Sequence, residues 1–129
     1  MRGLPSGLHT LWRPATLSRP CIEISVLFSL RGMTPGRIFA QVMGRIGAPS
    51  RGRDVNTHGL GDLSLGIFDY VSHLPQVMPV ALGAAMTFQY RGEKRVALTY
   101  FGDGASSEGG CHETLNLAAV FQAPVGIRS

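Results

Sequence analysis

Apolar and polar positions in the C-terminal half of the chain predict two strands separated by a helix. The continuous apolar run at residues 96–101 is typical of a strand buried on both faces of a parallel sheet, and a second apolar segment begins at Val125. Residues 107–122 between them carry apolar side chains at helical spacing, and Pro124 ends that helix. Strand, helix and strand in this order form a βαβ unit. We therefore expect an α/β fold, with a parallel sheet flanked by helices.

A second predicted helix lies at residues 34–43. Thr34 has the side chain of an N-cap, Pro35 suits the first helical position, and Gly44 allows the helix to stop. The helix carries an apolar stripe of four side chains, which are Ile38, Phe39, Val42 and Met43. We expect this stripe to face the core and the helix to carry no chemistry of its own.

Three further segments complete the pattern. Residues 79–90 predict a third helix, which begins at Pro79 and has Gly92 where a C-terminal cap belongs. Residues 21–30 alternate partly at period two and fit either a strand or a helix. Residues 44–75 form a long glycine-rich loop, and a loop of this length in a compact domain is usually functional or disordered.

The turn Gly102-Asp103-Gly104 follows the first predicted strand and precedes the helix. A strand, a glycine turn and a helix start together present backbone N–H groups to a phosphate, and glycine lets the backbone come close without a Cβ. A carboxylate at such a site repels the anion unless a divalent cation lies between them, so Asp103 favours a diphosphate bridged by Mg²⁺. The alternative, for these three residues alone, is an ordinary strand-to-helix turn.

This turn differs from the common nucleotide-binding motifs. It has neither the Gly-x-Gly-x-x-Gly spacing of dinucleotide sites nor the Gly-Lys-Ser/Thr of P-loops. A generic nucleotide-binding α/β domain is the competing interpretation. The missing motifs and the carboxylate within the turn both weigh against it.

Charge and cysteine usage exclude several other classes of function. Residues 1–53 contain eight arginines and one acid, whereas residues 54–129 contain four basic residues and seven acids. The arginines are scattered among prolines and apolar residues, so we expect a solvated surface and no nucleic-acid partner. No apolar run approaches the ~20 residues that span a bilayer, and we expect no membrane association. Two cysteines without metal-ligand spacing fit a reducing compartment.

The residues around the turn resemble one enzyme family. The matching stretches are residues 100–109 (Tyr-Phe-Gly-Asp-Gly-Ala-Ser-Ser-Glu-Gly), 112–113 (His-Glu), 115–116 (Leu-Asn), 118–121 (Ala-Ala-Val-Phe) and 123–125 (Ala-Pro-Val). They resemble the alpha subunit of thiamine-diphosphate-dependent 2-oxo acid dehydrogenases, the decarboxylating component of the pyruvate and branched-chain complexes. The resemblance implies a partial thiamine-diphosphate-binding fold, with thiamine diphosphate and Mg²⁺ as cofactors.

The resemblance also implies roles for individual residues. Those at the cofactor are Gly102, Gly104 and Ala105, which bind the diphosphate through backbone N–H groups, Asp103, which binds Mg²⁺, Ser72 and Leu74, which hold the aminopyrimidine, and Met78, which supports the bent cofactor. His58, which follows Gly52-Arg53, would act beside the substrate as a proton donor or as a hydrogen-bond donor to an anionic intermediate. The alternatives are a solvent-exposed loop histidine and a loop with an ordinarily packed methionine.

The implied reaction is the oxidative decarboxylation of pyruvate or a branched-chain 2-oxo acid, with transfer of the acyl group to a lipoyl-bearing acyltransferase. The implied partner is a beta subunit, in an alpha2-beta2 heterotetramer, which supplies the glutamate that activates the cofactor. An acetoin dehydrogenase alpha subunit and a non-catalytic truncated remnant of the same fold are the alternatives. We expect a cytoplasmic protein, or one of the mitochondrial matrix if it is eukaryotic.

The resemblance does not extend over the whole chain. We expect residues 1–32 to be a divergent N-terminal segment and residues 33–129 to be a partial thiamine-diphosphate-binding domain, truncated at its C-terminus. The family's metal site includes an Asn beyond the strand that begins at Val125, and no such Asn is present. We therefore expect a fragment of the alpha subunit that is inactive alone. Val71, His73 and Val77 depart from the family's potassium site, so the potassium ion is not carried over from the resemblance.

Overall fold

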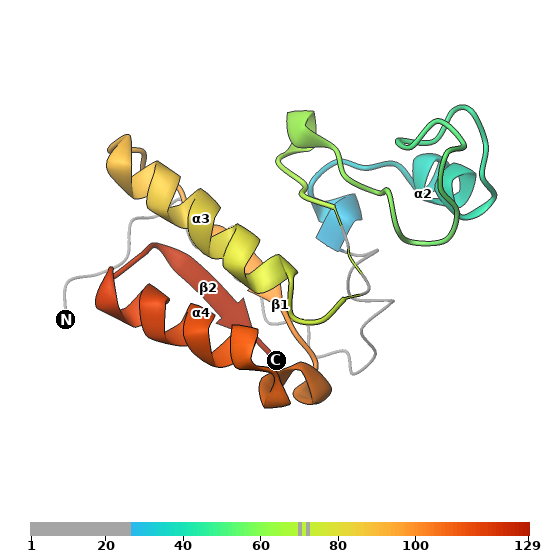
Figure 1. The fold of residues 1–129 in the computed structure, drawn as a ribbon. Helices are drawn as coiled ribbons and strands as arrows, with labels where there is room; N and C mark the ends of the chain where they lie inside the picture. Colours follow the sequence, from blue (N-terminus) through green and yellow to red (C-terminus); the bar gives the residue numbers. More distant parts are fainter. Residues whose placement is uncertain (1–26, 70, 72) are drawn as a thin grey trace.

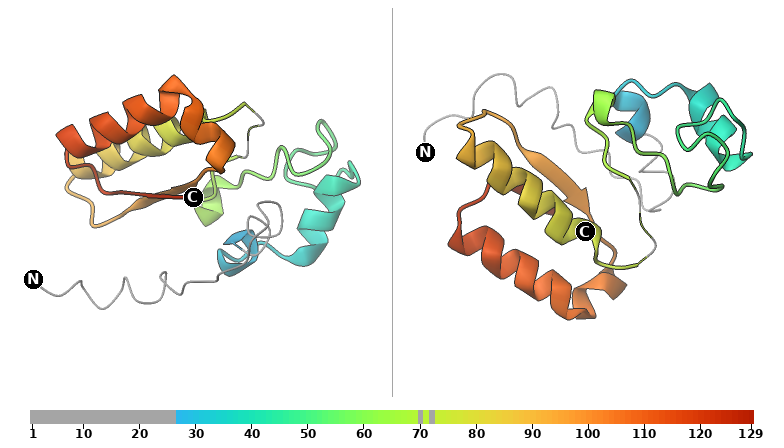
Figure 2. Two further views of the ribbon diagram at one scale, coloured as in Figure 1. Left: turned by 90° about the horizontal axis from the view of Figure 1, so that it is seen from below. Right: turned by 45° about the horizontal axis from the view of Figure 1, so that its top comes forward.

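The structure, a computed structural model, describes residues 27–69, 71 and 73–129 (Figure 1). Most of the predicted divergent segment, residues 1–32, lies outside the described residues, as does the predicted cofactor ligand Ser72. Figures 1 and 2 show two groups of elements: helix α2 with the loop that follows it, and two longer helices with a small sheet.

The sheet contains strands β1 (Ala97–Tyr100) and β2 (Val125–Arg128), which pair in parallel with Ala97 opposite Val125. Helix α4 (Gly109–Val120) connects the two strands, so the predicted βαβ unit and the α/β fold class are confirmed. The helix begins later than predicted because the 3-10 helix η2 (Asp103–Ser107) occupies the chain between β1 and α4.

Helix α3 (Val77–Tyr90) lies beside α4, and both helices cover the same face of the sheet (Figures 1 and 2). The helix begins two residues before Pro79, so that Pro79 lies in its first turn. Proline is tolerated there because the N–H groups of a first turn have no partner within the helix. Gly92, just beyond its end, has a φ of +66°, as predicted for a cap position. None of the helices in the described ranges is long and apolar enough to cross a membrane.

Side chains of β1 alternate between a covered and an exposed face of the sheet. Thr99 is 4% exposed, whereas Leu98 and Tyr100 are 44% and 41% exposed. The expectation of a strand covered on both faces is therefore wrong for the part of the chain that the structure describes. The reason is that α3 and α4 lie on one face together (Figure 2).

The elements around α2 have a small core of their own. Residues 27–30 are helical, which decides between strand and helix for the described end of that segment. Helix α2 (Pro35–Val42) begins at the predicted proline, and the 3-10 helix η1 (Leu63–Leu65) follows the long loop. The buried side chains of this core are Phe28, Met33, Leu60 and Ile67, with Ile38 and Leu65 packed against them.

Helix α2 turns most of its apolar stripe away from this core. Phe39, Val42 and Met43 are exposed and only Ile38 is partly buried, whereas Gln41 is completely buried. The prediction of a core-facing stripe is therefore wrong for three of its four residues. The orientation follows from hydrogen bonds between the Gln41 amide and the loop after the helix.

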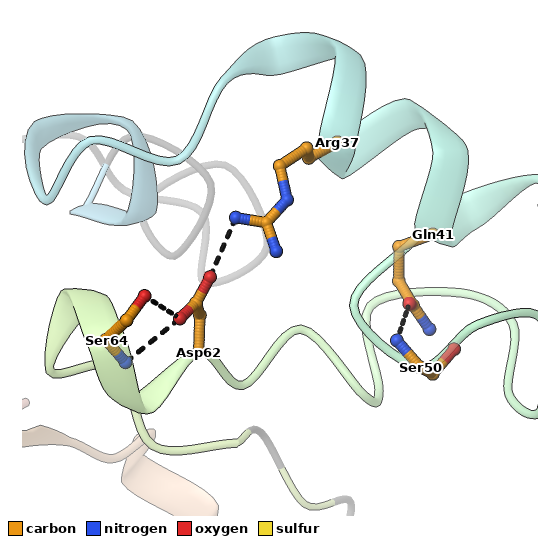
Figure 3. Close-up of polar contacts among 5 residues, drawn as sticks. All are labelled: Arg37, Gln41, Ser50, Asp62 and Ser64. Atoms are coloured by element: carbon orange, nitrogen blue, oxygen red, sulfur yellow. Dashed lines mark hydrogen bonds and ion pairs between the residues drawn. The ribbon is translucent and has the colours of Figure 1, made fainter. Parts of the chain in front are cut away.

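Polar contacts hold η1 against α2. Arg37 donates to one oxygen of the Asp62 carboxylate at 2.7 Å, and Ser64 donates to the other oxygen (Figure 3). Arg31 donates twice to the Leu65 carbonyl, at 2.9 and 2.7 Å. The hydrogen bond from the Ser64 side chain, and then the one from Arg37, lowers the pKa of Asp62 from its ordinary value of 3.8.

Replacement of Leu60 tests the small core. Leu60 is completely buried, so Leu60→Ala should lower the free energy of unfolding by about 2–5 kcal/mol, through lost burial and the cavity left behind. Leu63→Ala is the matched control because Leu63 is 79% exposed, and it should change stability by less than about 0.5 kcal/mol. Urea denaturation measures both. Equal destabilisation by the two changes would contradict the described core.

The lowered pKa of Asp62 makes stability depend on pH in a defined direction. Because the folded pKa lies below 3.8, the ionised carboxylate stabilises the fold above that pH, and this contribution is lost as the pH falls through the folded pKa. Asp62→Asn should therefore lower Tm at pH 6 and have a shrinking effect below pH 4. Thermal unfolding from pH 2 to pH 6 measures this, with Glu113→Gln, an exposed acid on α4, as control. A Tm difference independent of pH would contradict it.

Candidate functional site

The glycine turn lies at the carboxyl end of β1 and leads through η2 into α4 (Figure 1). Gly102 is extended, with φ −90° and ψ 164°, and Asp103 then begins η2. A Cβ added at Gly102 or at Gly104 would meet no atom within 4 Å, so the space beside the backbone of the turn is open. An approaching phosphate needs such open space at the end of a strand.

Most backbone N–H groups of the turn have no acceptor within the described chain. This holds for Gly102, Asp103 and Gly104, whereas the N–H of Ala105 donates to the Gly102 carbonyl at 2.9 Å. Ala105 is also completely buried. The turn therefore offers adjacent donors to an anion, and the Ala105 N–H becomes available only if this conformation changes.

The Asp103 side chain is exposed at the first position of η2. The Ser106 hydroxyl donates to the Asp103 main-chain carbonyl. Among the residues that the structure describes, no three His, Cys, Asp or Glu side chains gather closely enough to hold a metal. A Mg²⁺ ion at Asp103 would therefore need its remaining oxygen ligands from a diphosphate, main-chain carbonyls or water.

The turn is joined to the predicted pyrimidine segment through the start of α4. A Cβ added at Gly110 would lie 3.3 Å from Cγ of Pro75, a distance that leaves almost no room for a side chain at this position. Leu74, next to Pro75, is 51% exposed, and Met78 is 1% exposed at the start of α3. The structure therefore brings the start of α4, which follows η2, close to Pro75 in the segment that precedes α3.

The structure does not bring His58 close to the glycine turn or to Pro75. His58 is half-buried in the loop after α2, and that group of elements lies apart from η2 in every view (Figures 1 and 2). Its main-chain carbonyl accepts from Nε2 of Gln41 at 2.6 Å. The predicted substrate residue therefore belongs to a separate loop whose backbone is held by α2.

The same loop lines an open pocket of about 430 Å³. Arg51, which lines the pocket, and the adjacent Gly52 have φ values of +56° and +75°. The lining residues are Pro49, Ser50, Arg51, Arg53, Asp54, Gly59, Gly61 and Asp69.

Sequence reasoning singled out Gly52-Arg53 but missed Gln41, because a glutamine among apolar helix residues gives no signal of its own burial. The six glycines from Gly44 to Gly66 were the available signal for a tightly wound loop.

Comparison with known proteins places these segments in one family. The family described as "Dehydrogenase E1 component" matches residues 24–128. The chain is 36% identical over 95 residues to the alpha subunit of acetoin:2,6-dichlorophenolindophenol oxidoreductase of Cupriavidus necator, a match covering 74% of this chain and 28% of that protein.

Two further relatives are also alpha subunits. The chain is 37% identical to mitochondrial 2-oxoisovalerate dehydrogenase subunit alpha 2 of Arabidopsis thaliana, over 74% of this chain and 20% of that protein. It is 35% identical to the pyruvate dehydrogenase E1 component subunit alpha of Rhizobium meliloti, over 73% and 27%. The chain thus spans between a fifth and three tenths of the length of these relatives. It belongs to the family of dehydrogenase E1 components.

Proposed function

We propose that this chain carries part of the thiamine-diphosphate site of a 2-oxo acid dehydrogenase alpha subunit. The family membership supports this assignment, since two of the relatives named above are alpha subunits of 2-oxoisovalerate dehydrogenase and pyruvate dehydrogenase. The observation that carries the proposal is the close approach of Gly110, at the start of α4 beyond the glycine turn, to Pro75, the neighbour of Leu74. A cofactor with a diphosphate at one end and an aminopyrimidine at the other fits two neighbouring segments of this kind.

The residues present fit the diphosphate end of such a cofactor. Backbone N–H groups of Gly102 and Gly104 have no other acceptor in the described chain, and open space lies beside both glycines. In this proposal they bind the diphosphate, and Asp103 binds Mg²⁺ as the single side-chain ligand from this part of the chain. Ala105 joins them only after its hydrogen bond to Gly102 opens.

The pyrimidine end rests on the segment before α3. In this proposal Leu74 holds the ring through its backbone, together with Ser72, which lies outside the described residues. In this proposal Met78 supports the bent cofactor. Its side chain is buried in the first turn of α3. The bound cofactor would supply a carbanion that attacks the keto carbon of a 2-oxo acid and an electron sink for decarboxylation.

The proposal also assigns a role to His58 and to two partner proteins. His58 would donate a proton or a hydrogen bond near the substrate, and its half-buried position in a fixed loop suits a residue with that task. A beta subunit would complete the site and supply the activating glutamate. The product acyl group would pass to a lipoyl-bearing acyltransferase.

Two alternatives rest on specific observations. An acetoin dehydrogenase alpha subunit is supported by an identity of 36%, close to the 37% and 35% of the branched-chain and pyruvate relatives. A non-catalytic remnant of the fold is supported by the finding that, among the described residues, no three His, Cys, Asp or Glu side chains lie close enough to hold a metal.

Calorimetric titration of thiamine diphosphate into the purified chain, with and without Mg²⁺, tests the proposal. Binding should require Mg²⁺, and Asp103→Ala should weaken it at least about tenfold, because the carboxylate would no longer hold the cation beside the diphosphate. Glu108→Ala is the matched control, since Glu108 is an exposed acid at the N-cap of α4 with no assigned role.

Two results would contradict the proposal. A chain that is folded by circular dichroism and binds no thiamine diphosphate with Mg²⁺ present would restrict the assignment to longer members of the family. Equal weakening by Asp103→Ala and Glu108→Ala would show that general negative charge, rather than a metal ligand, governs binding.

A further inference from the structure

The Gln41 side chain is the one polar group of α2 that lies entirely in the interior. Its Nε2 donates to the main-chain carbonyls of Asp54 and His58, at 3.1 and 2.6 Å. Its Oε1 accepts from the N–H of Ser50 at 3.2 Å (Figure 3). One amide thus satisfies backbone groups at three points of the loop, and a buried amide without such partners would be costly.

The loop is wound closely around this amide. Ser50 also donates from its hydroxyl to the Asp54 carbonyl at 3.1 Å, so two of the anchored residues contact each other. Gly59, directly after His58, has a φ of +77°, and a Cβ there would lie 3.0 Å from both Nε2 of Gln41 and Cβ of Ser50. A side chain at position 59 would therefore press against the Gln41 amide, so the backbone directly after His58 lies close to this amide.

The orientation of α2 is further evidence that the Gln41 amide matters for the structure of this loop. Two apolar side chains of this helix and one at its C-cap are exposed while a glutamine is buried, which is the reverse of what hydrophobic burial alone would select. The exposed side chains in question are Phe39, Val42 and Met43. Hydrogen bonds from Gln41 to the loop favour the observed orientation, together with the Arg37–Asp62 ion pair and the packing of Ile38 against the small core.

We propose that Gln41 is a positioning residue for His58: its amide fixes the main-chain carbonyl of His58 and thereby the direction in which the imidazole leaves the loop. The functional meaning of this inference rests on the role of His58 in the proposed function. The physical statement, that one amide determines the place of one imidazole, holds or fails without any cofactor. It goes beyond the cofactor site because Gln41 lies on a different element from every residue assigned there.

The test is heteronuclear NMR of the ligand-free chain, with ring-labelled histidine, comparing wild type with Gln41→Met. Methionine keeps nearly the volume of glutamine and removes both the donors and the acceptor. The His58 ring signals should shift and broaden, whereas those of His73 and His112, which lie on other elements, should stay in place. Hydrogen exchange of the Ser50 amide should become at least about tenfold faster, because it loses its acceptor.

Gln89→Met is the matched control. Gln89 also donates from Nε2 to a main-chain carbonyl, that of Phe121 at 3.2 Å, but it lies on α3 and is exposed. This variant should leave the His58 ring signals and the Ser50 exchange rate unchanged. His58 signals that move equally in both variants, or in neither, would overturn the proposal.

Gln41→Glu keeps the test decisive if the methionine variant loses its fold. Glutamate retains the shape and an acceptor for Ser50 but cannot donate to the two carbonyls while ionised. The proposal requires the His58 ring signals to move in this variant while amide signals of α3 and α4 persist. Loss of the α3 and α4 signals in both variants would overturn the proposal, because Gln41 would then serve the fold as a whole.

Failure of this proposal and failure of the proposed function are separate results. Loss of thiamine diphosphate binding by the wild-type chain would leave the effect of Gln41 on His58 intact. Conversely, cofactor binding at Asp103 does not depend on where the His58 ring lies.

Discussion

The close approach of Gly110 to Pro75 is the contact on which the candidate site depends. It joins the first turn of α4 to the segment before α3, and a side chain at position 110 would press against the Pro75 ring. The glycine turn leads through η2 into α4, and α3 begins two residues after Pro75, so the contact links the elements that follow the two predicted cofactor segments. The open backbone at Gly102–Gly104 would otherwise be one anion-binding turn among many.

A second constraint acts in the other group of elements, where a buried amide replaces the usual apolar contact. Burial of Gln41 is stable because three backbone groups of the loop satisfy it, and the loop in turn is ordered because the amide is there. The two constraints are independent: one places backbone N–H groups for a phosphate, and the other holds a histidine-bearing loop. Joining them into one active site requires surfaces that other parts of an E1 assembly would provide.

Sequence reasoning predicted the elements with strong local signals and failed where tertiary contacts decide. The βαβ unit and the start of α2 at Pro35 followed from apolar runs, helical spacing and proline chemistry. The burial of Gln41 and the exposure of Phe39 did not, because periodicity indicates which side chains share a helix face and not which face finds a partner. The contact between Gly110 and Pro75 was equally invisible, since it joins residues far apart in the sequence. The roles of Asp103, Leu74, Met78 and His58 stay predictions from resemblance.

The central claim is that the glycine turn and the segment before α3 form one cofactor site. Titration of thiamine diphosphate with Mg²⁺ into isotope-labelled chain, followed residue by residue in amide NMR spectra, tests it most directly. Simultaneous shifts are expected at Gly102, Gly104 and Gly110 and at Leu74, with one common Kd, and no shift is expected in the Gln41 loop. Shifts confined to one of the two segments, or different Kd values for each, would contradict it.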